Sequence, residues 1–438
     1  MEEKEEYYNI LKKFFEAVSS LDKNGKESLT SRDLFMLMKD KDTIKSDEDI
    51  VEFIIDYLRC EDGNEDYNEG QRKRLSEIKE IIEKNSKMNY IYKNIISDGK
   101  KYKTKDPYVK FLIHNCNNRN EKIMQQIKLL KNNQIKNLVS LFESLISSIL
   151  SYFYRFTQNS NDLANQKIKF SDLEHIEKIE EIKDLVVDQK VTSIMHCGFS
   201  DWIKKFVDEC TKKGYKSIAS KYQERLNELI ELFERRHLLT HNNGIMNHLY
   251  LSKIKGISTN SFKVGDEIKF SDEYLHASIR NVLYMGTVLF INTLDKRGLS
   301  RDGVFLGDLN NLGLDYLHNG YYKEAKIIFN YIYENTNKKE LYKYNFWLSN
   351  LLEDKNTDTT EIEEHFENKD SLNEHDLLAK SILLREDNYI EILESFLQDV
   401  TYERVITILN WPIFELIKKE EQFIEFKDKY LYNNFKGV

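Results

Sequence analysis

The chain has 438 residues, which is enough for two or three domains of ordinary size. It contains only 2 proline and 16 glycine residues, whereas a sheet-rich fold of this length would need more turn residues, so we expect an all-α protein. The net charge of −9 argues against a protein that coats nucleic acid without selectivity.

The N-terminal sequence and the cysteines indicate in which cellular compartment the protein is expected. The chain begins Met-Glu-Glu-Lys-Glu-Glu, which is too acidic for a secretory signal, and no apolar run is long enough to span a membrane. The four cysteines form no CxxC pair and have no zinc-like spacing. We therefore predict a soluble, cytoplasmic protein without a metal or another cofactor.

Short amphipathic helices are predicted through most of the N-terminal region, residues 1–119. Residues 4–20 and 72–85 show helical periodicity. Two further segments, residues 30–36 and 46–58, each begin with hydroxyl or acidic side chains that can cap a helix. We expect an N-terminal helical region with exposed loops between its helices.

A basic stretch covers residues 91–137, which carry a net charge of +8 in an otherwise acidic chain. Such a stretch can face phosphates, but it can equally be a solvated loop and helix face. A lysine-rich loop at residues 97–107 is its most basic part. If the loop faces RNA, the candidate contacts are Lys100, Lys101, Lys103 and Lys105.

The next helices are longer and more apolar. A helix is predicted from Glu121 to Tyr154, and its second half is apolar over more than one face, which is typical of a buried helix. Further helices are predicted at residues 186–197, at 200–210 with a cap at its start, and at 276–295. Residues 262–270 are predicted to form a short hairpin or extended pair.

The helix that follows Gly214 changes character near its C-terminal end. Its apolar face runs from Leu226 to Phe233, and the same face then turns polar and ionisable. The polar positions are Arg236, His237, Thr240 and His241. Burying such groups unpaired is costly, so this face needs partners or a function. Residues 242–244, Asn-Asn-Gly, then end the helix.

The run Arg236-His237-Leu238-Leu239-Thr240-His241 has an Arg, a polar residue, three more residues and a His. It resembles the motif of HEPN domains (higher eukaryotes and prokaryotes nucleotide-binding), and the following Asn-Asn-Gly-Ile run fits the same motif helix. The resemblance implies a HEPN-type helical bundle over residues 120–300. It also implies a metal-independent endoribonuclease whose products end in 2′,3′-cyclic phosphate.

Metal-independent RNA cleavage needs a base for the 2′-hydroxyl, a proton for the leaving oxygen and positive charge at the phosphorus. Histidine titrates near neutrality and can carry the proton steps, while arginine offers a charged fork to phosphate oxygens. The resemblance implies that His241 is the acid or base and that Arg236 holds the phosphate. His237 would orient these groups, Asn242 could add a hydrogen bond, and Arg235 is a further candidate RNA contact.

Two other interpretations of the motif remain open. Arg236 and the two histidines could simply neutralise the C-terminus of their helix, where cations are favoured. Alternatively, Glu234, His237 and His241 could bind zinc together with His248. Zinc-binding helices usually carry a Glu directly after the first His, and this helix does not.

The C-terminal region, residues 301–438, contains a repeat-like pattern. Residues 304–336 resemble a tetratricopeptide (TPR) helical hairpin, with a turn at 318–322 and small residues at Gly313 and Ala325 that would let two helices approach closely. Asn337 stands where proline is usual in that pattern, and residues 377–397 look like a degenerate second copy. The resemblance implies a TPR-like array that could bind a regulatory protein.

The chain is therefore predicted to be a regulated RNA-cleaving toxin or antiphage-defence effector. It contains a single motif, whereas in HEPN relatives two motif faces usually line one cleft, so a homodimer is implied. The alternative is a non-catalytic adaptor that dimerises through a HEPN-type bundle and binds partner proteins through its repeats.

Overall fold

A computed structural model describes most of the chain, namely residues 2–28, 46–62, 69–97, 102–156, 178–257, 262–336, 339–354, 356–398 and 400–432, with short pieces between 163 and 176. The prediction of an all-α protein is confirmed, because the described residues form helices apart from one small hairpin and an isolated bridge. None of the helices that can be described combines the length and the hydropathy needed to cross a bilayer.

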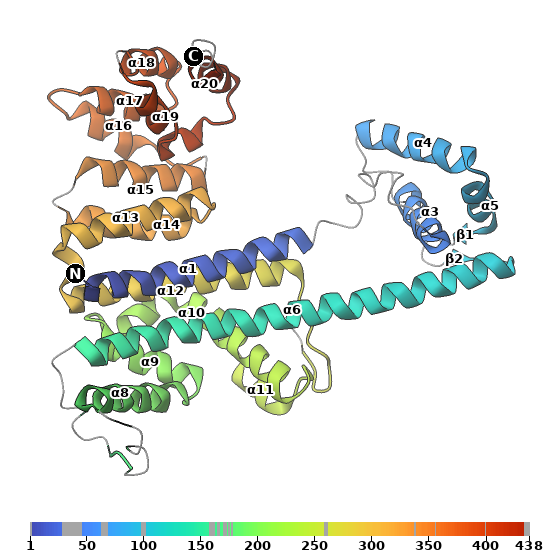
Figure 1. The fold of residues 1–438 in the computed structure, drawn as a ribbon, viewed down its shortest axis with the longest axis horizontal. Helices are drawn as coiled ribbons and strands as arrows, with labels where there is room; N and C mark the ends of the chain where they lie inside the picture. Colours follow the sequence, from blue (N-terminus) through green and yellow to red (C-terminus); the bar gives the residue numbers. More distant parts are fainter. Residues whose placement is uncertain are drawn as a thin grey trace.

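One very long helix organises the molecule. Helix α6 (Pro107–Phe156) has 50 residues and so extends over roughly 75 Å at 1.5 Å per residue. Its C-terminal half belongs to a central bundle, and its N-terminal end carries a separate lobe (Figure 1). A stack of shorter helices continues from the other side of the bundle to the C-terminus.

The lobe consists of α3 (Asp47–Asp62), α4 (Glu69–Lys84), α5 (Ser86–Asn94) and the hairpin of β1 (Ile96–Ser97) with β2 (Tyr102–Lys103). These elements close around the first turns of α6. Their core is separate from the main core of the protein, and its fully buried members are Val51, Ile54, Ile82, Ile91, Val109 and Cys116.

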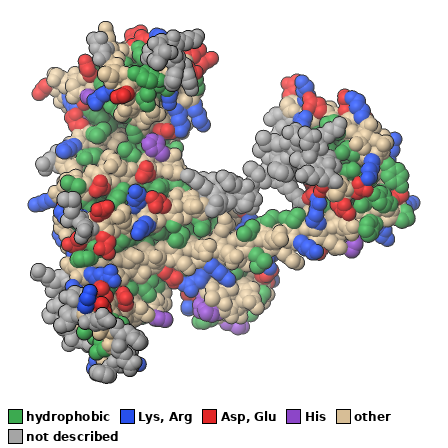
Figure 2. Space-filling view, viewed as in Figure 1, with side chains coloured by type: hydrophobic (Ala, Val, Ile, Leu, Met, Phe, Trp, Pro, Cys, Tyr) green, Lys and Arg blue, Asp and Glu red, His purple; other side chains and the backbone are tan. Residues whose placement is uncertain are grey.

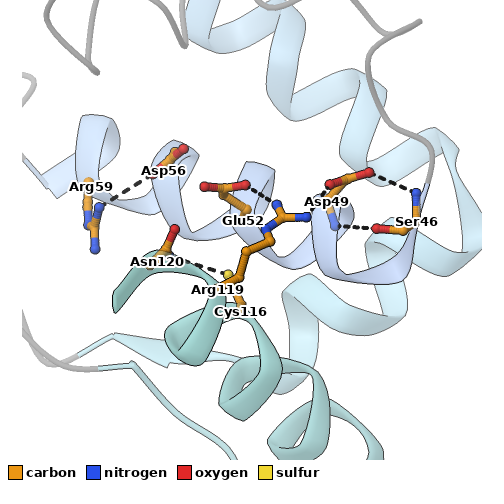
Figure 3. Close-up of polar contacts among 8 residues, drawn as sticks. All are labelled: Ser46, Asp49, Glu52, Asp56, Arg59, Cys116, Arg119 and Asn120. Carbon is orange, nitrogen blue, oxygen red and sulfur yellow. Dashed lines mark hydrogen bonds and ion pairs between the residues drawn. The ribbon is translucent and has the colours of Figure 1, made fainter. Parts of the chain in front are cut away.

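Arg119 of α6 fastens the lobe to the long helix. Its guanidinium pairs with Asp49, at 2.8 Å, and with Glu52, both on α3 (Figure 3). Asp49 also takes part in a reciprocal cap with Ser46, since each backbone N–H donates to the other residue's side chain. Arg119 therefore connects the start of α3 with the part of α6 where the long helix leaves the lobe.

Beyond Arg119, α6 crosses to the bundle as a neck formed by residues 121–130, and all of them except Ile127 are exposed. Figure 2 shows this narrow connection between two larger masses, with hydrophobic side chains on its surface. The large apolar side chains exposed there are Ile123, Met124, Leu129 and Leu130. Within the described residues, the lobe and the bundle therefore meet through little more than one helix.

The central bundle contains α1 (Glu2–Ser28), α8 (Ile179–Met195), α9 (Phe199–Cys210), α10 (Gly214–His241), α11 (His248–Lys253) and α12 (Asp272–Arg297), together with the second half of α6. Helix α1 packs on α6 and α12, so it is part of the bundle although it was predicted within the N-terminal region 1–119. Gly286 allows this contact, because a Cβ there would lie 2.5 Å from the ring of Phe14.

Several predicted boundaries differ from the structure. Helix α6 begins at Pro107 rather than Glu121, because Asp106 accepts a bond from the Val109 N–H at 2.8 Å and caps the helix. Helix α9 follows Gly198 and has no side-chain cap, whereas a cap had been expected from residues 200–202. Helix α10 begins at Gly214 as predicted and is kinked at Tyr222. The predicted helix at residues 30–36 lies outside the described residues.

After α12 and a short 3-10 turn, α13 (Gly303–His318) and α14 (Tyr322–Asn335) form the helical hairpin that the sequence predicts. Its turn contains Gly320 at φ +76°, a conformation that suits glycine. Gly313 lets the helices approach, because a Cβ there would lie 2.8 Å from the ring of Phe329. Asn337 lies outside the described residues.

The stack continues with α15 (Glu340–Glu353), α16 (Thr360–Glu367), α17 (Glu374–Leu383), α18 (Tyr389–Phe396), α19 (Tyr402–Leu409), the 3-10 helix η5 (Pro412–Leu416) and α20 (Glu421–Tyr432). The main core runs without interruption from the bundle through α13, α14 and α15 into this stack. The last helices have a smaller core of their own.

Candidate active site

An open cleft of about 980 Å³ lies beside the C-terminal half of α10, bounded by α6, α8 and α9. Three of the predicted site residues, Arg236, His237 and His241, line it together. Lys253 of α11 adds a further positive charge to the same cleft. The motif face is therefore accessible rather than buried in the bundle.

Aromatic packing sets the position of this face. Phe233 lies against Phe199, with ring centroids 4.1 Å apart, and against Trp202 at 5.7 Å, so α10 is held on α9. One turn later on the same helix, Arg236 reaches the cleft with its guanidinium 6.0 Å from the centre of the Phe233 ring. The apolar contact thus places the first motif residue at the edge of the core.

Arg236 forms an ion pair with Glu143 of α6, which also lines the cleft. The Nε of Arg236 is buried and has no hydrogen-bond partner among the described residues. Burial raises the pKa of Glu143, while the charge of Arg236 opposes that rise. Glu143 was not predicted from the sequence, because it lies 93 positions before Arg236 and no local pattern marks it.

The two motif histidines are neighbours and both are exposed, with ring centroids 4.7 Å apart. The pKa of His237 is lowered, first by partial burial and then by positive charge from His241, Lys253 and Arg236. Glu234 opposes this shift, but its carboxylate is 2.7 Å from the Lys253 ammonium. The neutral imidazole of His237 is therefore favoured, and that is the form that accepts a proton.

Arg235, a predicted RNA contact, points away from the cleft and is only 4% exposed. It pairs with Glu231 one turn earlier on α10, and its guanidinium lies 4.0 Å from the centre of the Tyr274 ring. The assignment to RNA binding is corrected, because a side chain enclosed in this way cannot reach a bound strand without unpacking.

Glu231 links the motif helix to its neighbours on that buried side. Tyr274 of α12 donates a hydrogen bond to its carboxylate at 2.6 Å, and Tyr250 of α11 donates another at 3.4 Å. Burial is the main reason why the pKa values of both tyrosines are raised. The cluster Glu231, Arg235, Tyr250 and Tyr274 therefore anchors α10 while the opposite face meets the cleft.

Asn242 does not line the cleft, and its amide donates to the Ile245 carbonyl in the turn that ends α10. Gly244, at φ +76°, continues this turn, and its carbonyl accepts a bond from the Ile268 N–H at 2.8 Å. Residues 262–270, predicted as a hairpin, thus pair with the turn after the motif helix rather than only with themselves. In this structure Asn242 has a structural role.

Two of the four predicted lysine contacts, Lys103 and Lys105, lie far from the cleft. Lys103 is on β2 and Lys105 follows it, both within the lobe, whereas Lys100 and Lys101 lie outside the described residues. The 36 residues of α6 between Pro107 and Glu143 span roughly 54 Å. Within one subunit, therefore, Lys103 and Lys105 cannot contact the same nucleotide as the motif.

Zinc binding by the motif gains no geometric support. Among the residues that the structure describes, no group of three or more His, Cys, Asp or Glu side chains could hold a metal ion. His248, the fourth proposed ligand, is exposed and does not line the cleft. Two unpredicted residues, His196 and Cys197, come from the end of α8 and line the cleft wall.

Comparison of the chain with protein-family models, with curated proteins and with solved structures finds no significant match.

Proposed function

We propose that the protein is a metal-independent endoribonuclease of HEPN type. The observation that supports this most directly is the convergence of Arg236, His237 and His241 on one wall of an open cleft. Simple neutralisation of a helix C-terminus would not require a cleft in front of the three side chains. The cleft is large enough to admit a nucleotide, and the arginine, the histidines and Lys253 favour an anionic ligand.

The residues suggest a division of labour. His237, with its lowered pKa, accepts the proton of the ribose 2′-hydroxyl, and His241 donates a proton to the leaving 5′-oxygen. The resemblance to HEPN domains implies that only His241 transfers protons and that His237 orients the other groups. Because the pKa of His237 is lowered, we assign His237 a proton transfer as well. Arg236 stabilises the charge that develops on the phosphate oxygens.

Glu143 occupies the place next to Arg236 that a phosphate would take. In this proposal the carboxylate holds the guanidinium in the cleft until RNA binds, and the phosphate then replaces it.

The experiment that tests the function is RNA digestion by the purified protein in the presence of EDTA. Because the proposed chemistry uses only imidazole and guanidinium groups, cleavage should continue at an unchanged rate and leave 2′,3′-cyclic phosphate ends. End-group analysis of the products measures this directly. Cleavage that stops in EDTA and returns with zinc would instead identify a metal enzyme.

The pH profile provides a second prediction. Because the pKa of His237 is lowered, its neutral form persists below the ordinary value of 6.5, so the acidic limb of kcat/KM should lie below pH 6.5.

Lys253→Met removes a positive charge and leaves Glu234 unpaired, and both changes raise the pKa of His237. The acidic limb should therefore move to higher pH. Lys255→Met, an exposed neighbour that does not line the cleft, is the matched control and should leave the limb unchanged.

We also propose that the active form is a homodimer, because one motif face offers a single arginine fork in a cleft open to solvent. A two-fold dimer would place two identical faces opposite each other. Sedimentation at the assay concentration should then detect a dimer, and specific activity should fall on dilution as the dimer dissociates. A monomer with full specific activity would show that one cleft suffices.

The biological role that fits this activity is a regulated RNA-cleaving toxin or defence effector. In this proposal the C-terminal stack receives the regulatory signal, since its core is continuous with the bundle that carries the motif. A change of packing in the stack could therefore reach α10 through α12 and α14, which are in contact.

A further inference from the structure

A second cavity lies in the C-terminal stack, among α13, α15, α17 and η5. Its volume of about 510 Å³ falls within the range of roughly 300–1,000 Å³ that is usual for small-molecule sites. Most of its wall is apolar, and the residues concerned are Leu314, Leu341, Leu348, Leu378, Ala379, Trp411, Pro412 and Ile413. No motif residue lines it, so it is separate from the candidate active site.

A pair of asparagine side chains lies within the apolar part of the wall. Asn345 is only 8% exposed, and its amide nitrogen donates to the Asn310 side-chain oxygen at 3.2 Å. The oxygen of Asn345 and the nitrogen of Asn310 form no other hydrogen bond among the described residues, and neither atom is one of the fully buried unpaired ones, so both are open to the cavity. Whichever way the two amides are turned, one donor and one acceptor remain at the cavity. The polar edge of a ligand can therefore pair with this donor and this acceptor in place of solvent.

The charged groups at the cavity are already ion-paired, and they leave one net negative charge because two carboxylates share one ammonium. The Lys369 ammonium lies 2.6 Å from Glu340 and 2.8 Å from Asp376, and Tyr344 donates to Asp376 at 2.7 Å. An anionic ligand would therefore be repelled, and each carboxylate among the described lining residues already has an ion-pair partner. At the rim, His375 stacks on Trp411 with ring centroids 5.6 Å apart, which adds a flat aromatic surface.

We propose that this cavity binds a neutral molecule that combines an apolar ring or side chain with one amide edge. The ring would lie against the leucines and Trp411, and the amide would pair with the free donor and acceptor of Asn310 and Asn345. A free small amide and an amide-bearing residue of a peptide share this chemistry, so the test must distinguish the two sources.

The probe is N-acetyl-L-phenylalaninamide, titrated into the full-length protein by ligand-observed NMR. We expect a dissociation constant of roughly 1 mM or below for a ligand of this size. Asn345→Leu keeps the side-chain volume but removes the hydrogen bonds, so the constant should rise at least about tenfold. Binding of ethylbenzene, which has no amide, should not weaken in this variant.

A second variant tests the location without touching the core. Leu341 is 62% exposed at the cavity, and Leu341→Trp should obstruct it and weaken binding of both probes. Leu377→Trp is the matched control, because Leu377 is also exposed in the stack but does not line the cavity. Equal probe binding by Leu341→Trp and Leu377→Trp would place the site elsewhere and overturn the proposal.

The two ligand sources are separated by a capped pentapeptide with phenylalanine in its centre. A peptide ligand would bind at least about tenfold more tightly than the single-residue amide, whereas a small-molecule site would bind both equally or exclude the peptide. Failure of both probes to bind, or unchanged binding of the amide by Asn345→Leu, would refute the assignment. Because the readout is binding and not cleavage, the result is independent of the proposed nuclease activity.

Discussion

Replacement of His241 by alanine is expected to slow RNA cleavage by about 100- to 10,000-fold, the usual range for loss of a general acid or base. Arg236→Ala should cost about 100- to 1,000-fold, because a charged donor to the phosphate is lost. His241 is exposed, so its replacement should leave the melting temperature of the central bundle nearly unchanged. Cleavage rates and thermal melts of the same protein preparations measure both effects.

Two controls make this result specific. His248→Ala removes an exposed histidine of α11 that does not line the cleft, and it should retain full activity. The double variant Arg236→Ala/Glu143→Gln removes the carboxylate that would otherwise be left without its partner, and it should remain inactive. Full activity in both single alanine variants would remove the basis of the nuclease proposal. A wild-type protein that cleaves no RNA would favour the adaptor interpretation.

Unlike the replacement of His241, Arg235→Ala should strongly destabilise the folded protein, whether or not RNA is present. It leaves the Glu231 carboxylate buried without its ionic partner, and breaking a buried pair in this way costs about 3–5 kcal/mol. Unfolding of the central bundle by denaturant measures the effect. A loss below about 1 kcal/mol would show that Tyr250 and Tyr274 satisfy Glu231 without the arginine.

Arg225→Ala is the matched control for this experiment. Arg225 lies on the same helix, pairs with Glu228 at 3.7 Å and lies 5.0 Å from the centre of the Tyr284 ring. Its side chain is 35% exposed, however, so solvent screens the pair and the loss should be about 1 kcal/mol or less. The contrast between the two arginines therefore isolates the contribution of burial.

The helical class, most of the helices and the hairpin at residues 303–335 follow from the sequence because each depends on local information. Periodicity marks a buried face, and residues such as Ser271 or Gly320 mark ends and turns. The start of α6 was missed because residues 107–120 are rich in asparagine and give a weak apolar pattern. Only the cap by Asp106 marks that start.

The candidate site was predictable only in part. Arg236 and His241 are visible because they stand five positions apart on one helix. Glu143 on α6, His196 in the turn after α8 and Lys253 on α11 reach the same cleft, and no spacing in the sequence encodes that proximity. Arg235 differs from Arg236 by one position, yet a rotation of about 100° along the helix buries the first and leads the second to the cleft.

The separate core of the lobe has a thermodynamic consequence. Cooperative unfolding requires that parts of a protein lose their contacts together, and within the described residues the lobe shares only the exposed neck of α6 with the bundle. A helix that contacts solvent on nearly all sides transmits little of the free energy of one core to the other. The lobe and the bundle should therefore melt as two independent units, and the chain as a whole has no single melting temperature.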